Sequence, residues 1–366
     1  MSLLHEIKKD FDYLQKMSIP ESTLYRKWCE LNKYEWSVTE KQLIWETQHS
    51  IWYPNKPEDY EKLEPGIIVV DDKNTGLIWT ILRKFISTMP WKQNVGRMMR
   101  FIVIDKITKK YLGVLSLASD FSSLTPRDKY IGWTYKQRIE EKMLIYTAMG
   151  STIVPTQPLG YNYTGGKLLT LLLCSDKVVN SWNKKYKEPL LGITTTSLYG
   201  GFSQYTGLKY WKKCGTSEGK IPLELSEDMY QEIRRWVKEK YPNDFKKITV
   251  NTTKILSRPK QRLLSFAYQK LKVKPPNNKA PRGVYFCKLY KETNDFLSKK
   301  VKNISTPLFD NDINVLVKIW KERYAKRRIE SLVNQGKNKN TILFYSDIIG
   351  MDWKTTKKKY LNEVGK

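Results

Sequence analysis

Apolar residues near the start of the chain recur at the spacing of an amphipathic helix. Leu4, Ile7, Phe11 and Leu14 fall on one helical face, and Pro20, followed by Glu, Ser and Thr, is typical of the start of a second helix. We therefore expect residues 1–65 to form a helical region. Four closely spaced tryptophans in this region are more typical of a core than of nucleic-acid stacking: Trp28, Trp36, Trp45 and Trp52.

From residue 66 the pattern changes to short apolar runs that are typical of strands. Residues 100–105 and 111–119 predict two adjacent strands, joined by a hairpin turn at residues 106–110. We also expect strands at 67–70, 151–155 and 190–196, helices at 136–147, 167–186 and 201–208, and a strand or the start of a helix at 76–82. This order predicts an α/β core, a mixed α+β sheet, over residues 66–224.

Helical patterns return after residue 225, interrupted by a Pro/Asn/Lys stretch at residues 272–282 that is typical of an exposed turn or linker. The 366 residues carry a net charge of +28, and residues 251–366 hold 27 Lys and Arg against nine Asp and Glu. So large an excess indicates a polyanionic partner, with nucleic acid first. The 40% of hydrophobic residues excludes a disordered basic tail. We expect residues 225–366 to be a basic helical region that binds DNA.

Cysteine and histidine are sparse, and this limits metal chemistry. Cys29, Cys174, Cys214 and Cys287 are scattered without a CxxC pair, and there are two histidines. We therefore expect free thiols and no metal site. The longest apolar run, at residues 168–174, is too short to span a bilayer, and the N-terminus lacks the pattern of a signal peptide. These features predict a soluble intracellular protein without a membrane partner.

A glycine-bearing loop at residues 160–167 lies between a predicted strand and a predicted helix. Backbone N–H groups at such a helix start can bind phosphate. The loop is not a Walker A motif, because Gly166 stands where the lysine belongs and Leu168 replaces the Ser or Thr. It resembles the pyrophosphate loop of acyl-CoA-dependent N-acyltransferases of the GNAT type. That resemblance implies an acyl-CoA or related donor, bound by Thr164, Gly165, Gly166 and Lys167; the alternative is a tight β–α turn.

Other motifs resemble a defence-system family. Arg127-Asp-Lys-Tyr-Ile-Gly-Trp resembles a signature of the Druantia system A proteins. The run of leucines from Leu168, followed by Asn180-Ser-Trp-Asn-Lys-Lys-Tyr, is similar to a second block of that family. The resemblance covers residues 111–219 and implies a bacterial cytoplasmic setting, in a phage or mobile element. Arg127 and Asp128 could form an internal ion pair that supports Trp133.

The block that begins at Tyr205 also resembles phage Mom-type DNA modification proteins, which are GNAT-like and modify adenine N6. The residues at 196–197 are Thr-Ser where those families have an Asp. Transfer to an exocyclic amine requires a flipped base, an aligned donor and removal of a proton. The candidate catalytic residues are Tyr205, Ser197 and Asp120. Tyr205 could equally pack a helix onto the sheet, and Asp120 could cap a turn.

The end of the chain contains two further candidate DNA-binding features. Residues 343–362 have the pattern of a helix-turn-helix, in which residues 353–361 would be the recognition helix. Its side chains facing DNA would be Thr355, Lys357 and Lys358. Before it, residues 313–333 predict an amphipathic helix whose basic residues could bind phosphate or simply face solvent. Its candidate contacts are Lys326, Arg327 and Arg328.

The sequence thus predicts a GNAT-like α/β core flanked by helical regions. The expected function is Mom-like modification of bases in double-stranded DNA. The alternative is a non-catalytic or nuclease-linked DNA-binding component of a Druantia-like defence or transposition system. RNA binding is a third possibility, although no RRM or KH signature is present.

Overall fold

The computed structural model describes residues 3–32, 34–89, 96–197, 200, 203–218, 220–221, 227–249, 259–274, 278–279 and 281–363. The chain divides into two units, of which one comprises Met1–Ser22 and Gly219–Ala280. The other comprises Thr23–Glu218 and Pro281–Lys366 and contains the main sheet. Within the described ranges, no helix is both long and apolar enough to cross a bilayer.

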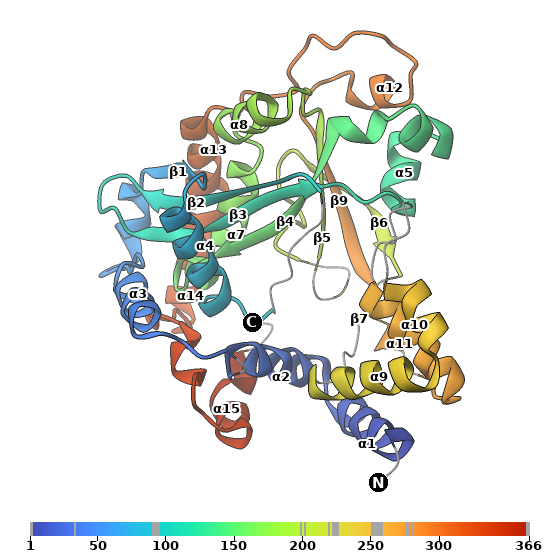
Figure 1. Ribbon diagram of the computed structural model, residues 1–366. Coiled ribbons are helices and arrows are strands. Elements are labelled where there is room, and N and C mark those ends of the chain that lie inside the picture. Colours follow the sequence, from blue (N-terminus) through green and yellow to red (C-terminus); the bar gives the residue numbers. More distant parts are fainter. Residues whose placement is uncertain are drawn as a thin grey trace. The chain divides into compact units, whose positions relative to one another are not determined.

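The larger unit is built on a seven-stranded sheet with the strand order β1-β2-β3-β4-β5-β9-β6 (Figure 1). Neighbouring strands are antiparallel except β4 and β5, which are parallel. The strands are β1 (Pro65–Val69), β2 (Met98–Asp105), β3 (Tyr111–Ser119), β4 (Thr147–Pro155), β5 (Gly192–Thr196), β6 (Trp211–Ser217) and β9 (Arg282–Lys288).

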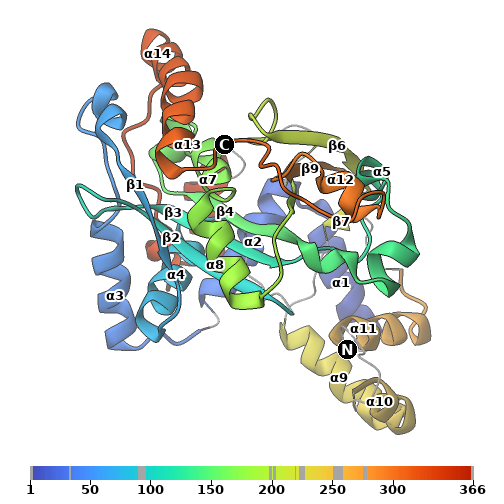
Figure 2. The same cartoon turned by 90° about the horizontal axis from the view of Figure 1, so that it is seen from above.

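Helices cover both faces of this sheet, because alternate residues of its central strands are buried on opposite sides. Phe101 and Val103 of β2 lie in one hydrophobic cluster, whereas Ile102 lies in another. Figure 2 shows α4 (Lys73–Phe85) and α7 (Gly165–Leu172) on opposite sides of the strands. The cluster on the α7 side includes α8 (Asp176–Tyr186) and α13 (Ile313–Trp320); the cluster on the α4 side includes α2 (Ile19–Asn32), α3 (Val38–His49) and α15 (Trp353–Tyr360).

Shorter elements complete the larger unit. The α-helices are α5 (Thr125–Ile131), α6 (Leu159–Asn162), α12 (Thr293–Leu297) and α14 (Lys326–Asn334). The 3₁₀ segments are η1 (Pro57–Lys62), η3 (Met143–Tyr146), η5 (Tyr345–Ile348) and η6 (Leu361–Glu363), and the π-helical turns are η2 (Lys136–Glu140) and η4 (Lys321–Ala325).

The smaller unit is a group of helices with its own core. Its helices are α1 (Leu3–Lys16), α9 (Glu227–Lys240), α10 (Pro242–Thr249) and α11 (Pro259–Lys270), and a two-stranded pairing joins β7 (Lys220–Ile221) to β8 (Asn278–Lys279). Ile7 and Phe11 of α1 pack with Ile233, Val237 and Leu263. The N-terminal helix thus belongs to a core whose other helices come from residues 227–270.

Several sequence predictions are confirmed. The strand at 111–119 has the expected bounds, and β2 forms the expected hairpin with it. Residues 76–82 lie inside helix α4, so the strand expected there is absent and the helical alternative holds. The N-terminal region is helical. Of its tryptophans, Trp52 is buried, whereas Trp45 is 56% exposed and does not belong to the core. Cys174 and Cys287 are buried thiols, and Cys29 and Cys214 are half-buried thiols.

Four predictions about elements require correction. Residues 136–147 form η2 and η3 rather than one helix, because Lys142 adopts a left-handed backbone conformation between them. The helix expected over 167–186 is divided into α7 and α8 by Ser175, which begins α8 in an extended conformation. Residues 203–208 form turns rather than a helix, while 201–202 lie outside the described residues. Finally, region 225–366 is not entirely helical, because β9 pairs between β5 and β6.

Candidate functional site

The parallel strands β4 and β5 separate along their length, and a cleft lies where they part. They pair only from Thr147 to Met149 against Gly192 to Thr194. Beyond this point β4 continues to Pro155, whereas β5 pairs with β9. The cleft has a volume of about 670 Å³, and its walls include Gly150, Pro155, Thr195, Thr196, Gln204 and Tyr205.

Side chains, rather than a strand, bridge the gap beside β4. The Thr195 hydroxyl donates to the Gly150 carbonyl at 3.1 Å, and the Gln204 amide lies 3.4 Å from the Ile153 carbonyl. In the described part of the chain, no strand pairs with this edge of β4 after Met149. An extended, amide-bearing chain could therefore form hydrogen bonds with this edge of β4.

Tyr205 is the candidate catalytic residue that lies in the cleft wall. It is 7% exposed, and its ring lies 5.3 Å from that of Tyr285 and 6.3 Å from that of Trp211. Burial raises the pKa of the Tyr205 hydroxyl, and hydrogen bonds with Gln204 and Thr195 oppose that rise. The hydroxyl is therefore protonated at neutral pH and can position a group or relay a proton, but it is no free base. The Tyr205 ring also packs against Tyr285 of β9, but from a turn rather than from the helix expected in the alternative.

Ser197 is fully buried, and its hydrogen bonds join the end of β5 to β9. Its hydroxyl accepts a hydrogen bond from the Gly283 amide at 2.7 Å and donates to the Gly200 carbonyl. Its own amide donates to the Gly283 carbonyl at 2.8 Å. These bonds occupy the hydroxyl, so the structure gives Ser197 a role in strand registry rather than a place in the cleft.

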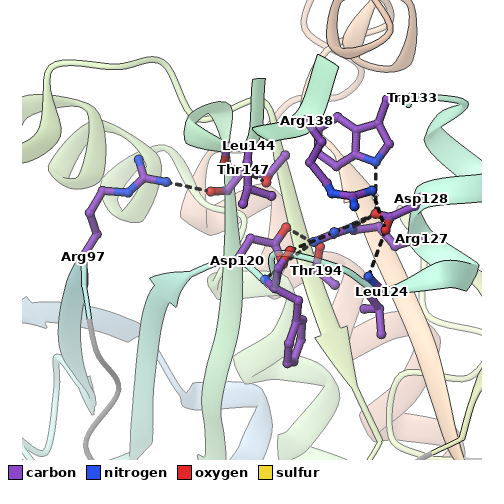
Figure 3. A network of polar contacts seen from close by, with 11 residues as sticks. Arg97, Asp120, Leu124, Arg127, Asp128, Trp133, Arg138, Leu144, Thr147 and Thr194 are labelled. Atoms are coloured by element: carbon purple, nitrogen blue, oxygen red, sulfur yellow. Dashed lines mark hydrogen bonds and ion pairs between the residues drawn. The ribbon is translucent and has the colours of Figure 1, made fainter. Parts of the chain in front are cut away.

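Asp120 follows β3 and pairs with the buried Arg127 (Figure 3). The Asp120 carboxylate lies 2.7 Å from Arg127 Nη1, and both side chains are fully buried. It also accepts hydrogen bonds from the Thr194 hydroxyl and the Phe121 amide, each at 2.8 Å. These interactions join β3, α5 and β5 and leave the carboxylate remote from solvent, so its role is structural.

The same network contains the expected pair of Arg127 and Asp128. The Asp128 carboxylate accepts hydrogen bonds from Arg127 Nε at 2.9 Å, from Arg138 Nη1 at 2.8 Å and from Trp133 Nε1 at 3.0 Å (Figure 3). The Arg127 guanidinium also lies 5.3 Å from the Trp133 ring centroid. Two arginines are thus balanced by two carboxylates, Asp120 and Asp128, in a buried network that supports Trp133 as expected.

The glycine loop ends in a tightly packed helix start. Thr164 adopts a left-handed conformation before α7. A Cβ atom on Gly165 would lie 2.9 Å from the Leu159 carbonyl oxygen, and one on Gly166 would overlap with the Gln204 amide. Close packing against these neighbours therefore explains both glycines.

Lys167 holds the turn that carries Tyr205. Its ammonium donates to the carbonyls of Gln204 at 3.0 Å and Thr206 at 2.8 Å, and burial lowers its pKa. A second hollow, of about 250 Å³, lies at this loop and is lined by Gly160, Thr164, Lys167 and Arg328 among others. It shares Gln157, Gly160, Tyr161 and Gln204 with the cleft beside β4, so the two are adjacent.

Comparison with known proteins supports the resemblance to the Druantia family, and no match supports the Mom-type or GNAT-type resemblance. A family model described as "Druantia protein DruA" matches residues 23–299. The chain belongs to the DruA family. Druantia protein DruA of Escherichia coli (strain UMEA 4076-1) is 25% identical over 169 residues, which are 42% of this chain and 41% of that protein. The chain thus spans about two fifths of that relative's length. No solved structure matches the chain.

The family match includes all seven strands of the main sheet but ends before α13–α15, where most of the candidate DNA contacts lie. Lys326 and Arg327 are exposed on α14. Arg328 is half-buried, donates from Nε to the Tyr161 carbonyl at 3.1 Å and lies over the Tyr161 ring. In this DruA-family protein Arg328 therefore belongs to the mouth of the smaller hollow.

The expected helix-turn-helix is present only in part. Its first element is the single 3₁₀ turn η5, after which Gly350 turns the chain with φ +79° into α15. Asp352 caps α15, and its carboxylate accepts hydrogen bonds from the amide and the hydroxyl of Thr355. Lys357 is half-buried and Lys358 is exposed. Ile348 and Tyr360 are buried in this segment, and Ile349 and Leu361 pack partly buried beside them.

Sequence reasoning missed two residues of the cleft. Gln204 covers Gly166 and reaches the edge of β4, and Arg83 lines the wall from the end of α4. Neither belongs to a motif; the one signal for Gln204 was its position next to Tyr205. In the ranges that the structure describes, no three His, Cys, Asp or Glu side chains gather as metal ligands.

Proposed function

We propose that this protein is a component of a Druantia-type anti-phage defence system that binds DNA and transfers an acyl-type group to adenine N6. Membership of the DruA family supports the defence role. The charge of +28 supports DNA as the partner.

The separation of β4 and β5 is the observation that carries the transferase part of the proposal. An antiparallel run from β1 to β4, a short parallel pairing with β5 and a late strand between β5 and β6 are what a GNAT-like core would have. The cleft opens where the parallel pair ends, directly before the glycine loop. These features support the proposed donor site by position, although fold alone does not establish activity.

The residues present fit a donor of the acyl-CoA type. The unpaired edge of β4 fits the amide-bearing arm, and the smaller hollow brings Arg328 close to the start of α7 for the phosphates. Thr164, Gly165 and Gly166 shape that hollow, while Lys167 positions the turn at Gln204. When bound, such a donor supplies the activated acyl group.

Tyr205 is the side chain that we assign to the acceptor. A flipped adenine must enter the cleft with N6 oriented toward the donor, and the protonated Tyr205 hydroxyl can fix that orientation or relay the departing proton. Exposed Lys326 and Arg327, with Lys358, would hold phosphates of the flanking duplex.

The test is mass spectrometry of digested DNA from a bacterium that expresses the protein. We expect a deoxyadenosine of increased mass with the wild-type chain and its loss in Tyr205→Phe, with DNA affinity unchanged. Tyr186→Phe is the matched control, because the Tyr186 hydroxyl bonds to Met98 outside the cleft. Unmodified DNA from wild-type cells would contradict the transferase proposal.

A second candidate is a DNA-binding component without chemistry. The positions of Ser197 and Asp120 favour it, because both side chains are engaged in structural bonds. Tight, salt-sensitive DNA binding without any modified nucleoside would support this alternative.

A further inference from the structure

Arg83 places a buried positive charge in the wall of the cleft. It lies near the end of α4 and is 8% exposed. Its Nη1 donates to the Met89 carbonyl at 2.9 Å, but Nε has no hydrogen-bond acceptor among the described residues. A guanidinium has five N–H donors in a planar fork, and the buried Nε–H of Arg83 is one that meets no acceptor in the described part of the chain.

A second buried cation lies near it. Lys27 is fully buried and pairs with Glu30 at 2.9 Å. Burial lowers the pKa of Lys27 to about 8, and repulsion from Arg83 contributes to that shift. Burial likewise lowers the pKa of Arg83 to about 10, with Glu30 as the opposing charge. Among these three residues, one carboxylate faces two cations.

This charge imbalance is unfavourable unless an anion compensates it. A buried charge that lacks a partner costs several kcal/mol, and a buried N–H without an acceptor adds about 1–3 kcal/mol. The cleft offers the space, and its wall near Arg83 also carries the hydroxyls of Ser87 and Thr88. Lys339 and Arg282 line the same cleft, against the single carboxylate of Glu363. These groups would together favour an anionic ligand.

We propose that Arg83 binds a backbone phosphate of the DNA strand whose base enters the cleft. This inference rests on the proposed function, since it takes DNA as the acceptor. The helix that carries Arg83 covers the face of the sheet opposite α7 and the glycine loop (Figure 2). Donor phosphates at that loop and an acceptor phosphate at Arg83 would therefore approach the cleft from opposite faces. A planar guanidinium matches two phosphate oxygens, as one Lys ammonium does not.

The experiment measures binding of single-stranded DNA of about 12 nucleotides by fluorescence anisotropy over a range of salt concentrations. We expect Arg83→Met to weaken binding about tenfold or more and to lower the salt slope by about 0.7. The melting temperature of Arg83→Met should equal or exceed that of the wild type, because the charges of Lys27 and Glu30 then balance. Lys300→Met, which removes a charge that is 70% exposed and paired with Asp295, is the matched control.

Replacing one phosphate of the DNA at a time by a neutral methylphosphonate identifies the phosphate that Arg83 binds. At one linkage, the replacement should lower the DNA affinity of the wild-type protein about tenfold. The same replacement should not lower the DNA affinity of Arg83→Met any further. If Arg83→Met does not fold, the linkage scan on wild-type protein and on Arg83→Lys decides, because a lysine should restore only part of the binding.

Each outcome bears on a different claim. Equal DNA affinity of Arg83→Met and Lys300→Met, or a scan in which no linkage stands out, would overturn the Arg83 site and leave the proposed function intact. Failure of the wild-type protein to bind any DNA would overturn both.

Discussion

Removal of the negative charge at Asp120 should destabilise the larger unit, because that charge balances a fully buried arginine. In Asp120→Asn, the amide keeps the shape of the side chain and an acceptor for the Phe121 amide. Arg127 retains Asp128 but loses the anion at 2.7 Å from Nη1. The network then holds two arginines and one carboxylate.

The magnitude follows from burial. Breaking a buried ion pair by removing one partner costs about 3–5 kcal/mol, and the asparagine variant should lie near the lower end because its hydrogen bonds partly remain. Asp120→Ala, which also removes the acceptor for the Phe121 amide, should lie near the upper end. For a unit of this size, these costs correspond to a fall of about 10 °C in melting temperature.

The assay is thermal unfolding followed by circular dichroism and tryptophan fluorescence. Asp295→Asn is the control, because its carboxylate is 56% exposed and 3.9 Å from the Lys300 ammonium; it should change stability by less than about 1 kcal/mol. A melting temperature of Asp120→Asn within about 1 °C of the wild type would refute the reasoning. Full stability with lost base modification would instead return Asp120 to the list of catalytic candidates.

Two other changes test packing and buried charge. Lys27 has a pKa of about 8 in the folded chain, below its unfolded value, so its charge costs stability below pH 8 and this cost disappears as the pH rises toward about 10.5. Between pH 7 and 10.5, the free energy of unfolding in urea should therefore rise by on the order of 3 kcal/mol more for the wild type than for Lys27→Met. A difference between the two proteins that stays constant with pH would contradict the lowered pKa of Lys27. Glu30 is present in both proteins. Gly166→Ala should displace Gln204 from the Ile153 carbonyl and cost about 1–3 kcal/mol. Adding Gln204→Ala should recover most of that loss, and an equal loss in both backgrounds would show that the clash is elsewhere.

Local patterns were sufficient for the hairpin of the sheet. The hairpin of β2 and β3 needs only neighbouring residues, so its apolar runs and its turn identified it. β9 was missed because its partners, β5 and β6, lie far away in sequence. The apolar run from Val284 to Cys287 carried a strand signal, but it follows a Pro/Asn stretch in a region with helical patterns.

The candidate site shows the same limit. Tyr205 was found through its resemblance to a known block, and it does line the cleft. Ser197 and Asp120 were chosen for chemical type, but long-range partners, Gly283 and Arg127, determine what their side chains do. Arg83 has the sequence context of an ordinary basic residue at a helix end. Its burial follows only from tertiary packing.

The position of β9 has a consequence for synthesis of the chain on the ribosome. β5 pairs with β4 over three residues, and β6 pairs only with β9 in the sheet as described. β6 must therefore wait, and β5 must wait for its second partner, until residues 282–288 have left the exit tunnel, after the whole segment 219–280 has been made. During that interval the nascent chain exposes unpaired strand edges, which are open to mispairing. The cleft is therefore completed late in synthesis, once β9, which is translated after Tyr205, has paired with β5 and β6.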